Sequence, residues 1–203
     1  MISRVTACVG ALICLLTSPE AVIGQTLADM VRANGGKPVT ITGTIDAPTV
    51  SVPDLPKYCD LIIVGSLTKK GSYVGKEQIF VYTDYALNPE RVLLNRSKAP
   101  ATSAAPAQTA PLTITLYGGT VEVDGVPVTV RDGSQPASLE GKRLLLFLTR
   151  NTEKPNNYFV YGNAGGIFEV GANGRLKSVS TEQGNAELDN MSVDELAQRL
   201  AKR

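Results

Sequence analysis

The clearest feature of the hydrophobic pattern is the segment at 142–149, KRLLLFLT, in which positions 144–148 are all apolar. A run of this length is too short for most helices. It is typical of a β-strand buried on both faces, because only such a strand is apolar at every position. Gly141 precedes the segment and Arg150 and Asn151 follow it. We therefore expect the other strands to close around this one.

Further strand patterns occur along the chain, separated by turn residues. The segment at 59–70, CDLIIVGSLTKK, is also apolar on both faces near its start, and Gly71 predicts a turn after it. The extended segment at 78–94 is interrupted by Asn88 and Pro89. This predicts an edge, a bulge or a bend, because proline donates no hydrogen bond to a strand ladder. Shorter strands are expected at 39–45, 112–116, 121–123, 126–130, 158–161, 167–170 and 176–179.

Two local patterns are more specific than the strands themselves. Asp124 and Gly125 lie between two alternating segments and predict a hairpin with a tight turn, because both residues tolerate positive φ. Near the C-terminal end, Ser192 is expected to cap a helix at about 192–202, with Glu195 completing a capping box. We expect the apolar stripe of this helix to dock on the body of the protein.

The balance of these elements predicts the fold class. Many short strands with glycine-rich turns, and short helices at 26–34 and 52–58 in addition to the C-terminal one, predict a mainly β fold, a small closed barrel rather than a sandwich. The segment at 96–111 is rich in Ala, Pro, Ser and Thr. It is expected to form a flexible loop, because it buries too little apolar surface to offset its ordering entropy. We expect 25–203 to form a single domain that contains this loop.

Residues 1–24 have the pattern of a secretory signal peptide. Arg4 gives a basic start, and the apolar stretch at 5–17 is shorter than the roughly 20 residues that a membrane-spanning helix needs. Cleavage is expected after Gly24. Lipid attachment at Cys8 is a less favoured alternative, because little apolar sequence precedes that cysteine. The protein is therefore expected to be secreted or periplasmic, with no membrane span after cleavage.

Composition restricts the chemistry. The chain contains no histidine, which removes the commonest general base and zinc ligand and excludes Ser-His-Asp and Cys-His catalysis within one chain. A net charge of +1 without a basic face argues against nucleic acid as a partner. Cleavage would leave Cys59 as the lone cysteine, so we expect no disulfide, and its apolar neighbours favour a buried thiol over a reactive one. No catalytic residue, metal site or cofactor is predicted.

Carboxylates are the remaining route to catalysis, since a pair of them can do acid–base work. For each candidate, a position in water on the surface is the favoured interpretation. Asp60, at the start of a buried strand, is interpreted as a structural residue bound by backbone amides of the turn before it. The glycine-rich segment at 162–166 matches no phosphate-binding fingerprint and is expected to be a loop or a bulge. The candidate acids are Asp84, Glu122, Asp124, Asp132 and Glu169.

Tyrosines supply the candidate binding surface. Aromatic faces on small barrels bind oligosaccharides or single strands of nucleic acid. Binding of a nucleic acid is the less favoured of the two, because the sequence predicts no basic groove for its phosphates. Taken alone, each tyrosine is more often a residue at a barrel edge with its hydroxyl in water than a binding residue. The favoured function is a non-enzymatic module that binds a protein or a carbohydrate; the alternatives are a carboxylate-dependent hydrolase and a structural accessory domain of the cell envelope. The candidate residues are Tyr73, Tyr82, Tyr85, Tyr117, Tyr158 and Tyr161.

The order of landmarks over 58–179 resembles that of a known family. The segments CDLIIVGSL, IFVYTDYALNPERVLL, LTITLYGG, EGKRLLLFL and YFVYGNAGGIFEV follow one another as in a group of uncharacterised secreted bacterial proteins. More distantly, they are similar to the netrin-like module of the tissue metalloproteinase inhibitors. The resemblance implies a closed or partly open OB-type barrel and an inhibitor-like role. Those inhibitors act through an N-terminal cysteine and disulfides; position 25 here is Gln25, so no inhibitory residue is carried over.

Overall fold

The structure is a computed structural model, and its described part is mainly β, as predicted. The expected signal peptide, Cys8 with it, and nearly all of the expected loop at 96–111 lie outside the described residues. The described residues are 25–43, 51, 53–96, 112–136, 138–154, 156–180 and 186–202. Their helices and strands are α1 (Leu27–Ala33), β1 (Val39–Gly43), α2 (Leu55–Tyr58), β2 (Leu61–Val74), β3 (Val81–Asn95), β4 (Leu112–Tyr117), β5 (Gly119–Val123), β6 (Val126–Asp132), β7 (Leu144–Arg150), β8 (Asn157–Val160), η2 (Asn163–Gly166), β9 (Ile167–Val170), β10 (Leu176–Ser178) and α3 (Val193–Ala201).

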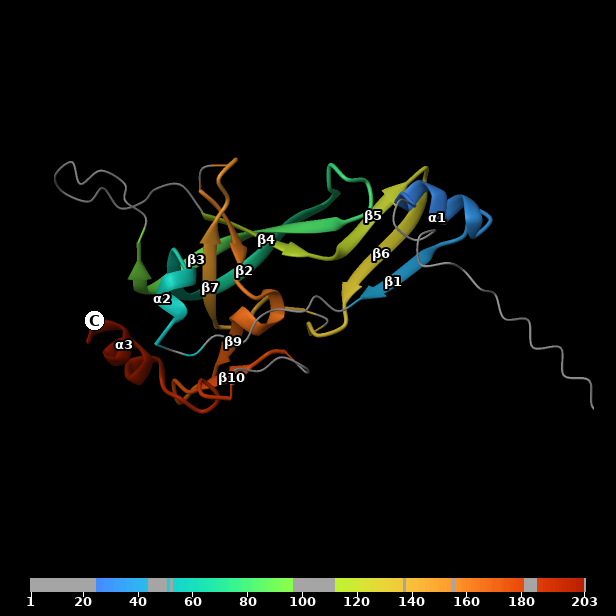
Figure 1. The fold of residues 1–203 in the computed structure, drawn as a ribbon. Helices are drawn as coiled ribbons and strands as arrows, with labels where there is room; N and C mark the ends of the chain where they lie inside the picture. Colours follow the sequence, from blue (N-terminus) through green and yellow to red (C-terminus); the bar gives the residue numbers. More distant parts are fainter. Residues whose placement is uncertain are drawn as a thin grey trace, which may run out of the picture.

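A closed barrel of five strands forms the centre of the molecule (Figure 1). Around the barrel the strands follow the order β2, β3, β4, β8 and β7, and β7 pairs with β2 again. Neighbouring strands are antiparallel except for β4 and β8, which are parallel. The predicted small closed barrel is therefore confirmed.

β7, the strand predicted to organise the fold, belongs to two parts of the sheet. One edge of β7 pairs with β2 from Leu144 to Leu148. The other edge is divided, because β9 pairs with its first part and β8 pairs with its last part, from Leu148 to Arg150. β8 closes the barrel, while β9 and β10 extend the sheet away from it. All positions from 144 to 148 are buried, as the sequence predicts.

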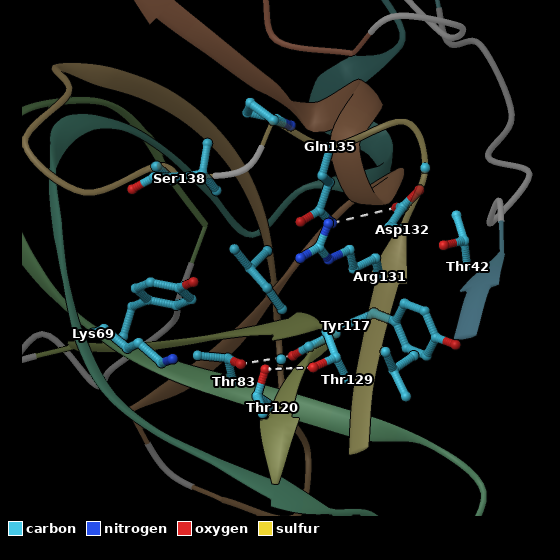
Figure 2. A pocket seen from close by; sticks show the side chains of 18 residues that line it. Thr42, Lys69, Thr83, Tyr117, Thr120, Thr129, Arg131, Asp132, Gln135 and Ser138 are labelled. Atoms are coloured by element: carbon cyan, nitrogen blue, oxygen red, sulfur yellow. Dashed lines mark hydrogen bonds between the residues drawn. The ribbon is translucent and has the colours of Figure 1, made fainter. Parts of the chain in front are cut away.

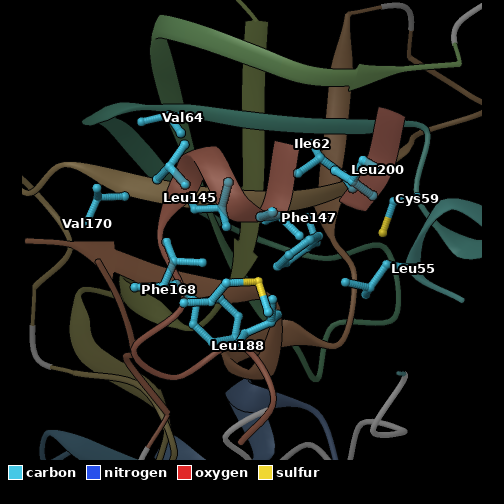
Figure 3. Packing of buried hydrophobic residues seen from close by; sticks show 14 residues of the cluster. Leu55, Cys59, Ile62, Val64, Leu145, Phe147, Phe168, Val170, Leu188 and Leu200 are labelled. Carbon is cyan, nitrogen blue, oxygen red and sulfur yellow. The ribbon is translucent and has the colours of Figure 1, made fainter. Parts of the chain in front are cut away.

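The two faces of β7 fill different hydrophobic cores. Leu144, Leu146 and Leu148 point into the barrel and pack with apolar residues of β2, β3, β4 and β8. Leu145 and Phe147 point the opposite way, into a cluster between the barrel wall, β9, β10 and α3 (Figure 3). One strand thus supplies the wall that the two cores share.

α3 covers the outer side of this wall. Its predicted cap is confirmed, since the Ser192 hydroxyl accepts a hydrogen bond of 3.0 Å from the Glu195 amide. The Glu195 carboxylate binds Arg199 at 2.7 Å, so only half of the predicted capping box forms. The expected docking of the helix on the protein's own body is confirmed by three residues of its stripe that lie buried in the cluster with Phe147: Val193, Leu196 and Leu200.

A three-stranded sheet of β1, β6 and β5 lies beside the barrel, with α1 packed on it (Figure 1). The predicted hairpin joins β5 and β6. Asp124 and Gly125 at its turn have φ angles of 53° and 77°, as a type I′ turn requires. Leu27 and Val31 of α1 pack against β6 and against Val81 of β3, which connects this third core to the barrel.

The turn predicted at Gly71 is wrong, because β2 continues to Val74 as one strand. The pairing between β2 and β3 skips Lys70, which forms a β-bulge. A bulge takes up an extra residue by bending the strand without ending it. The chain reverses only at 75–80.

The irregularity predicted at Pro89 is a β-bulge opposite Gly65. The register between β2 and β3 shifts between Val64 and Gly65, and Pro89 lies on the part of β3 that pairs only with β2. A side chain at Gly65 has no room, because its Cβ would overlap the carbonyl oxygen of Asn88. Glycine at this position therefore permits the close approach of the two strands.

We predict that Gly65→Ala lowers the free energy of unfolding by about 1–3 kcal/mol, the usual range for overpacking a tight site. Gly71→Ala is the matched control on the same strand, because nothing lies within 4 Å of a Cβ built there. Urea denaturation followed by circular dichroism measures both variants. Equal stability of the two would contradict the close approach at Gly65.

Candidate functional site

Four aromatic rings form a connected cluster on the barrel, which we call the aromatic patch: Tyr73, Phe80, Tyr82 and Tyr117. Tyr82 lies at its centre, with ring centroids 6.0 Å from Tyr73, 6.4 Å from Phe80 and 6.3 Å from Tyr117. Phe80 and Tyr117 are also in edge contact at 5.8 Å. All four rings are at least partly exposed to solvent. The patch is therefore part of the protein surface, and one of its rings, Tyr117, also packs against the core between α1 and β6.

The strand register explains why these rings meet. Tyr73 of β2 lies opposite Tyr82 of β3, which lies opposite Tyr117 of β4. Directly opposite residues place their side chains on the same face of a sheet. Val81 and Thr83, the neighbours of Tyr82, are buried on the other face.

Polar groups border the patch on the same face. Asp84 accepts a hydrogen bond from the Thr115 hydroxyl at 2.5 Å, and the Tyr73 hydroxyl lies 3.5 Å from the same carboxylate oxygen. The Thr115 hydroxyl also contacts the side-chain oxygen of Asn157 at 3.0 Å. The Lys154 ammonium lies over the Tyr73 ring, 5.5 Å from its centroid. Aromatic rings thus adjoin a carboxylate, a hydroxyl, an amide and an ammonium group.

Burial is the main cause that raises the pKa of Tyr73, Tyr82 and Tyr117 above the usual tyrosine value. Nearby carboxylates raise these pKa values further: Asp84 acts on Tyr73, and Glu77 acts on Tyr82. The three phenols therefore stay protonated at neutral pH, and their hydroxyls are available as hydrogen-bond donors.

The structure brings together only three of the six candidate tyrosines, and it adds Phe80. Tyr158 is 2% exposed and packs inside the barrel. Tyr161 stacks on Tyr58 at 5.6 Å, beside the first residues of β2, whereas Tyr73 lies near the last ones. Tyr85 lines a pocket. Phe80 precedes β3 in a turn, and its 37% exposure is the feature that marks it as part of a surface.

The pocket lies between the barrel, the β5–β6 hairpin and residues of the segments 133–136 and 138–139 (Figure 2). Its volume is about 480 Å³. Tyr85, Thr83 and Tyr117 contribute from the barrel strands, so Tyr117 belongs to both the pocket and the aromatic patch. Lys69 and Arg131 also line it.

The expectation that Asp132 lies in water is wrong, because this residue is 5% exposed. One carboxylate oxygen accepts from the amide and hydroxyl of Ser134, at 2.9 and 2.6 Å. The other accepts from the side chains of Asn163 at 2.5 Å and Gln135 at 3.3 Å. These donors, which come from the turn after β6 and from the 3-10 helix η2, replace the water that a buried carboxylate loses.

The other candidate acids do not join Asp132 in the pocket. Glu122 is exposed, and Asp124 lies in the hairpin turn, as expected. Glu169 pairs with Lys142 at 2.8 Å, and Asp84 borders the aromatic patch. Of the five candidates, only Asp132 lines the pocket, and its four hydrogen bonds occupy both of its oxygens.

Cys59 and Asp60 have structural surroundings. Cys59 is 2% exposed in the cluster around Phe147, and burial, together with the charge of Asp60, raises its thiol pKa to about 12. Asp60 accepts a hydrogen bond of 2.8 Å from the Arg150 amide. This donor lies at the end of β7. The expectation that backbone amides of the turn before Asp60 bind its carboxylate is therefore wrong. The glycine-rich segment forms the short 3-10 helix η2.

Within the described ranges, no group of three or more Cys, Asp or Glu residues is placed to hold a metal ion. None of the helices in this part of the chain is both long and apolar enough to cross a membrane.

Comparisons with models of known protein families and with curated proteins find no match to this chain. The resemblance to netrin-like modules is therefore an expectation that no match supports.

We predict that Cys59 does not react with a thiol reagent in the folded protein at pH 8, because a pKa of about 12 leaves almost no thiolate. Absorbance with Ellman's reagent measures this in a variant in which Cys8 and Cys14 are replaced by serine. Adding guanidinium chloride should expose one reactive thiol. Folding raises the pKa of the Cys59 thiol from 9.0 to about 12, so the unfolded chain loses this proton at a lower pH than the folded protein does. The free energy of unfolding should therefore also fall as the pH rises from about 9 towards 12. Rapid labelling of the native protein would contradict the burial.

Proposed function

We propose that the protein is a secreted or periplasmic non-enzymatic module whose aromatic patch binds an oligosaccharide. One observation carries the proposal: the connected rings around Tyr82 lie beside the carboxylate of Asp84 and the ammonium group of Lys154. A sugar ring presents an apolar C–H face and a rim of hydroxyls. The patch offers an aromatic surface for the first and acceptors and donors for the second.

The barrel topology supports this position for a ligand. Numbered along the chain, the barrel strands follow the order first, second, third, fifth and fourth, with the third and fifth parallel. This order supports the OB-type barrel that the family resemblance implies. In OB-type barrels, oligosaccharides and oligonucleotides bind on the second and third strands, between the loops that follow the first and fourth. Here those strands carry Tyr82 and Tyr117, and those loops carry Phe80 and Lys154.

The charges around the patch favour a sugar over a nucleic acid. Lys76 pairs with Glu153 at 3.2 Å, and Lys154 is balanced by Asp84 and Glu77 near the same rings. A single strand of nucleic acid needs a track of cations along its phosphates. An uncharged or weakly charged oligosaccharide needs none. A protein partner, the other class expected from the sequence, is an outcome of the binding test.

The two alternative functions receive less support. A carboxylate-dependent hydrolase needs two acids in one concavity, and the pocket contains only Asp132 of the five candidates. A structural role in the cell envelope predicts no soluble ligand for the aromatic patch. The same binding experiment therefore tests it.

We predict that an array of bacterial and plant oligosaccharides identifies a ligand, and that Tyr82→Ala weakens its binding at least about tenfold in calorimetry, as for a central aromatic contact. Tyr161→Ala is the matched control, because that partly exposed ring stacks on Tyr58 at the other end of β2. Circular dichroism confirms that both variants fold.

The proposal fails if no oligosaccharide binds while a protein partner is retained through the same patch. It also fails if Tyr82→Ala and Tyr161→Ala weaken oligosaccharide binding equally, because the binding site would then lie elsewhere.

A further inference from the structure

The pocket beside the barrel contains two cationic side chains, Lys69 and Arg131. Figure 2 shows them reaching towards the middle of the pocket from different sides, with Thr83, Thr120 and Thr129 along its lower side. Among the described residues, neither cation forms a side-chain hydrogen bond or an ion pair. Both charges are therefore left without a counter-charge in direct contact.

Some of the other described cations are paired. Lys142 contacts Glu169 at 2.8 Å, and Arg143 forms an ion pair with Glu90. Such surface pairs contribute little to stability. Lys69 and Arg131 are themselves exposed, so it is their shared position on the pocket, and not the lack of an ion pair, that makes them candidates for binding an anion.

The two acids nearest to the pocket are engaged with other donors. Asp132 uses both carboxylate oxygens for Ser134, Gln135 and Asn163. Glu140 accepts a hydrogen bond of 2.8 Å from the backbone amide of Lys69. Asp132 lowers the positive potential of the pocket but does not bind either cation. The lining residues therefore have a net charge of +1, from two cations and one anion.

Hydroxyl groups complete the lining. Thr120 and Thr129 are hydrogen-bonded to each other at 2.9 Å, and Thr83 donates to the carbonyl of Gly118 at 2.6 Å. Burial and, less strongly, the charge of Glu140 raise the pKa of Tyr85, so this phenol is a donor at neutral pH. Tyr85 also supplies an apolar ring face to the same pocket.

We propose that this pocket binds a small organic anion, with its carboxylate or phosphate group held between Lys69 and Arg131. Guanidinium and ammonium groups form charge-assisted hydrogen bonds with such oxygens, and a volume of about 480 Å³ is within the range of small-molecule sites. The hydroxyls of the pocket hold the uncharged part of the molecule. This site is separate from the proposed oligosaccharide contact around Tyr82, although Tyr117 borders both.

Nuclear magnetic resonance titrations with three matched probes test the proposal: glucose, glucuronate and glucose 6-phosphate, at constant ionic strength. The amide signals of Thr129 and Gly133 report on the pocket, and those of Tyr73 and Tyr82 report on the aromatic patch. We expect at least one acidic probe to shift the pocket signals saturably, with glucose at least about tenfold weaker. The tighter acidic probe identifies carboxylate or phosphate as the preferred group.

Arg131→Gln and Lys69→Gln should each weaken binding of the acidic probe about tenfold or more, the loss expected for one charge-assisted hydrogen bond. Arg150→Gln is the control, because it removes the charge of an arginine outside the pocket. The proposal is overturned if glucose binds as tightly as the acids, or if Arg131→Gln has no effect. Saturable shifts only around Tyr82, or no pocket binding with a Kd below about 10 mM, would also overturn it.

Discussion

The burial of β7 on both faces is the interaction on which the rest of the structure depends. Leu146 and Leu148 help to fill the barrel, while Leu145 and Phe147 hold the layer of β9, β10 and α3 against its outside. Burying each of these side chains contributes about 1.5–3 kcal/mol relative to leaving it exposed. The loss of this one strand would therefore open two cores at once and separate α3 from the barrel.

Closure of the barrel also positions both candidate sites. β2 and β3 are long enough to extend beyond β7, and their far ends carry Tyr73 and Tyr82 on one outer face. The β4–β5 connection redirects the chain at Gly118 and Gly119, which both have positive φ. A Cβ at Gly119 would overlap the side chain of Thr83, so this close approach needs glycine. It brings the β5–β6 hairpin against the barrel, and the pocket forms between them.

The sequence predicted features that depend on neighbouring residues along the chain. The burial of β7 and the turn at Asp124 follow from local patterns, and both are confirmed. The bulge at Lys70 was missed because it is defined by the register with β3, not by Gly71 itself. The burial of Asp132 depends on Asn163, a residue distant in the chain. For the same reason, no local pattern distinguished Tyr82, in the patch, from Tyr158, in the core.

Native-state hydrogen exchange of the backbone amides is the most direct test of the central role of β7. The amides at 144–148 lie between β2 on one side and β8 or β9 on the other. They should exchange only through global unfolding, with an exchange free energy equal to the free energy of unfolding in urea. Exchange of these amides at a lower free energy than those of β1 or β10, at the edges of the sheets, would contradict the account.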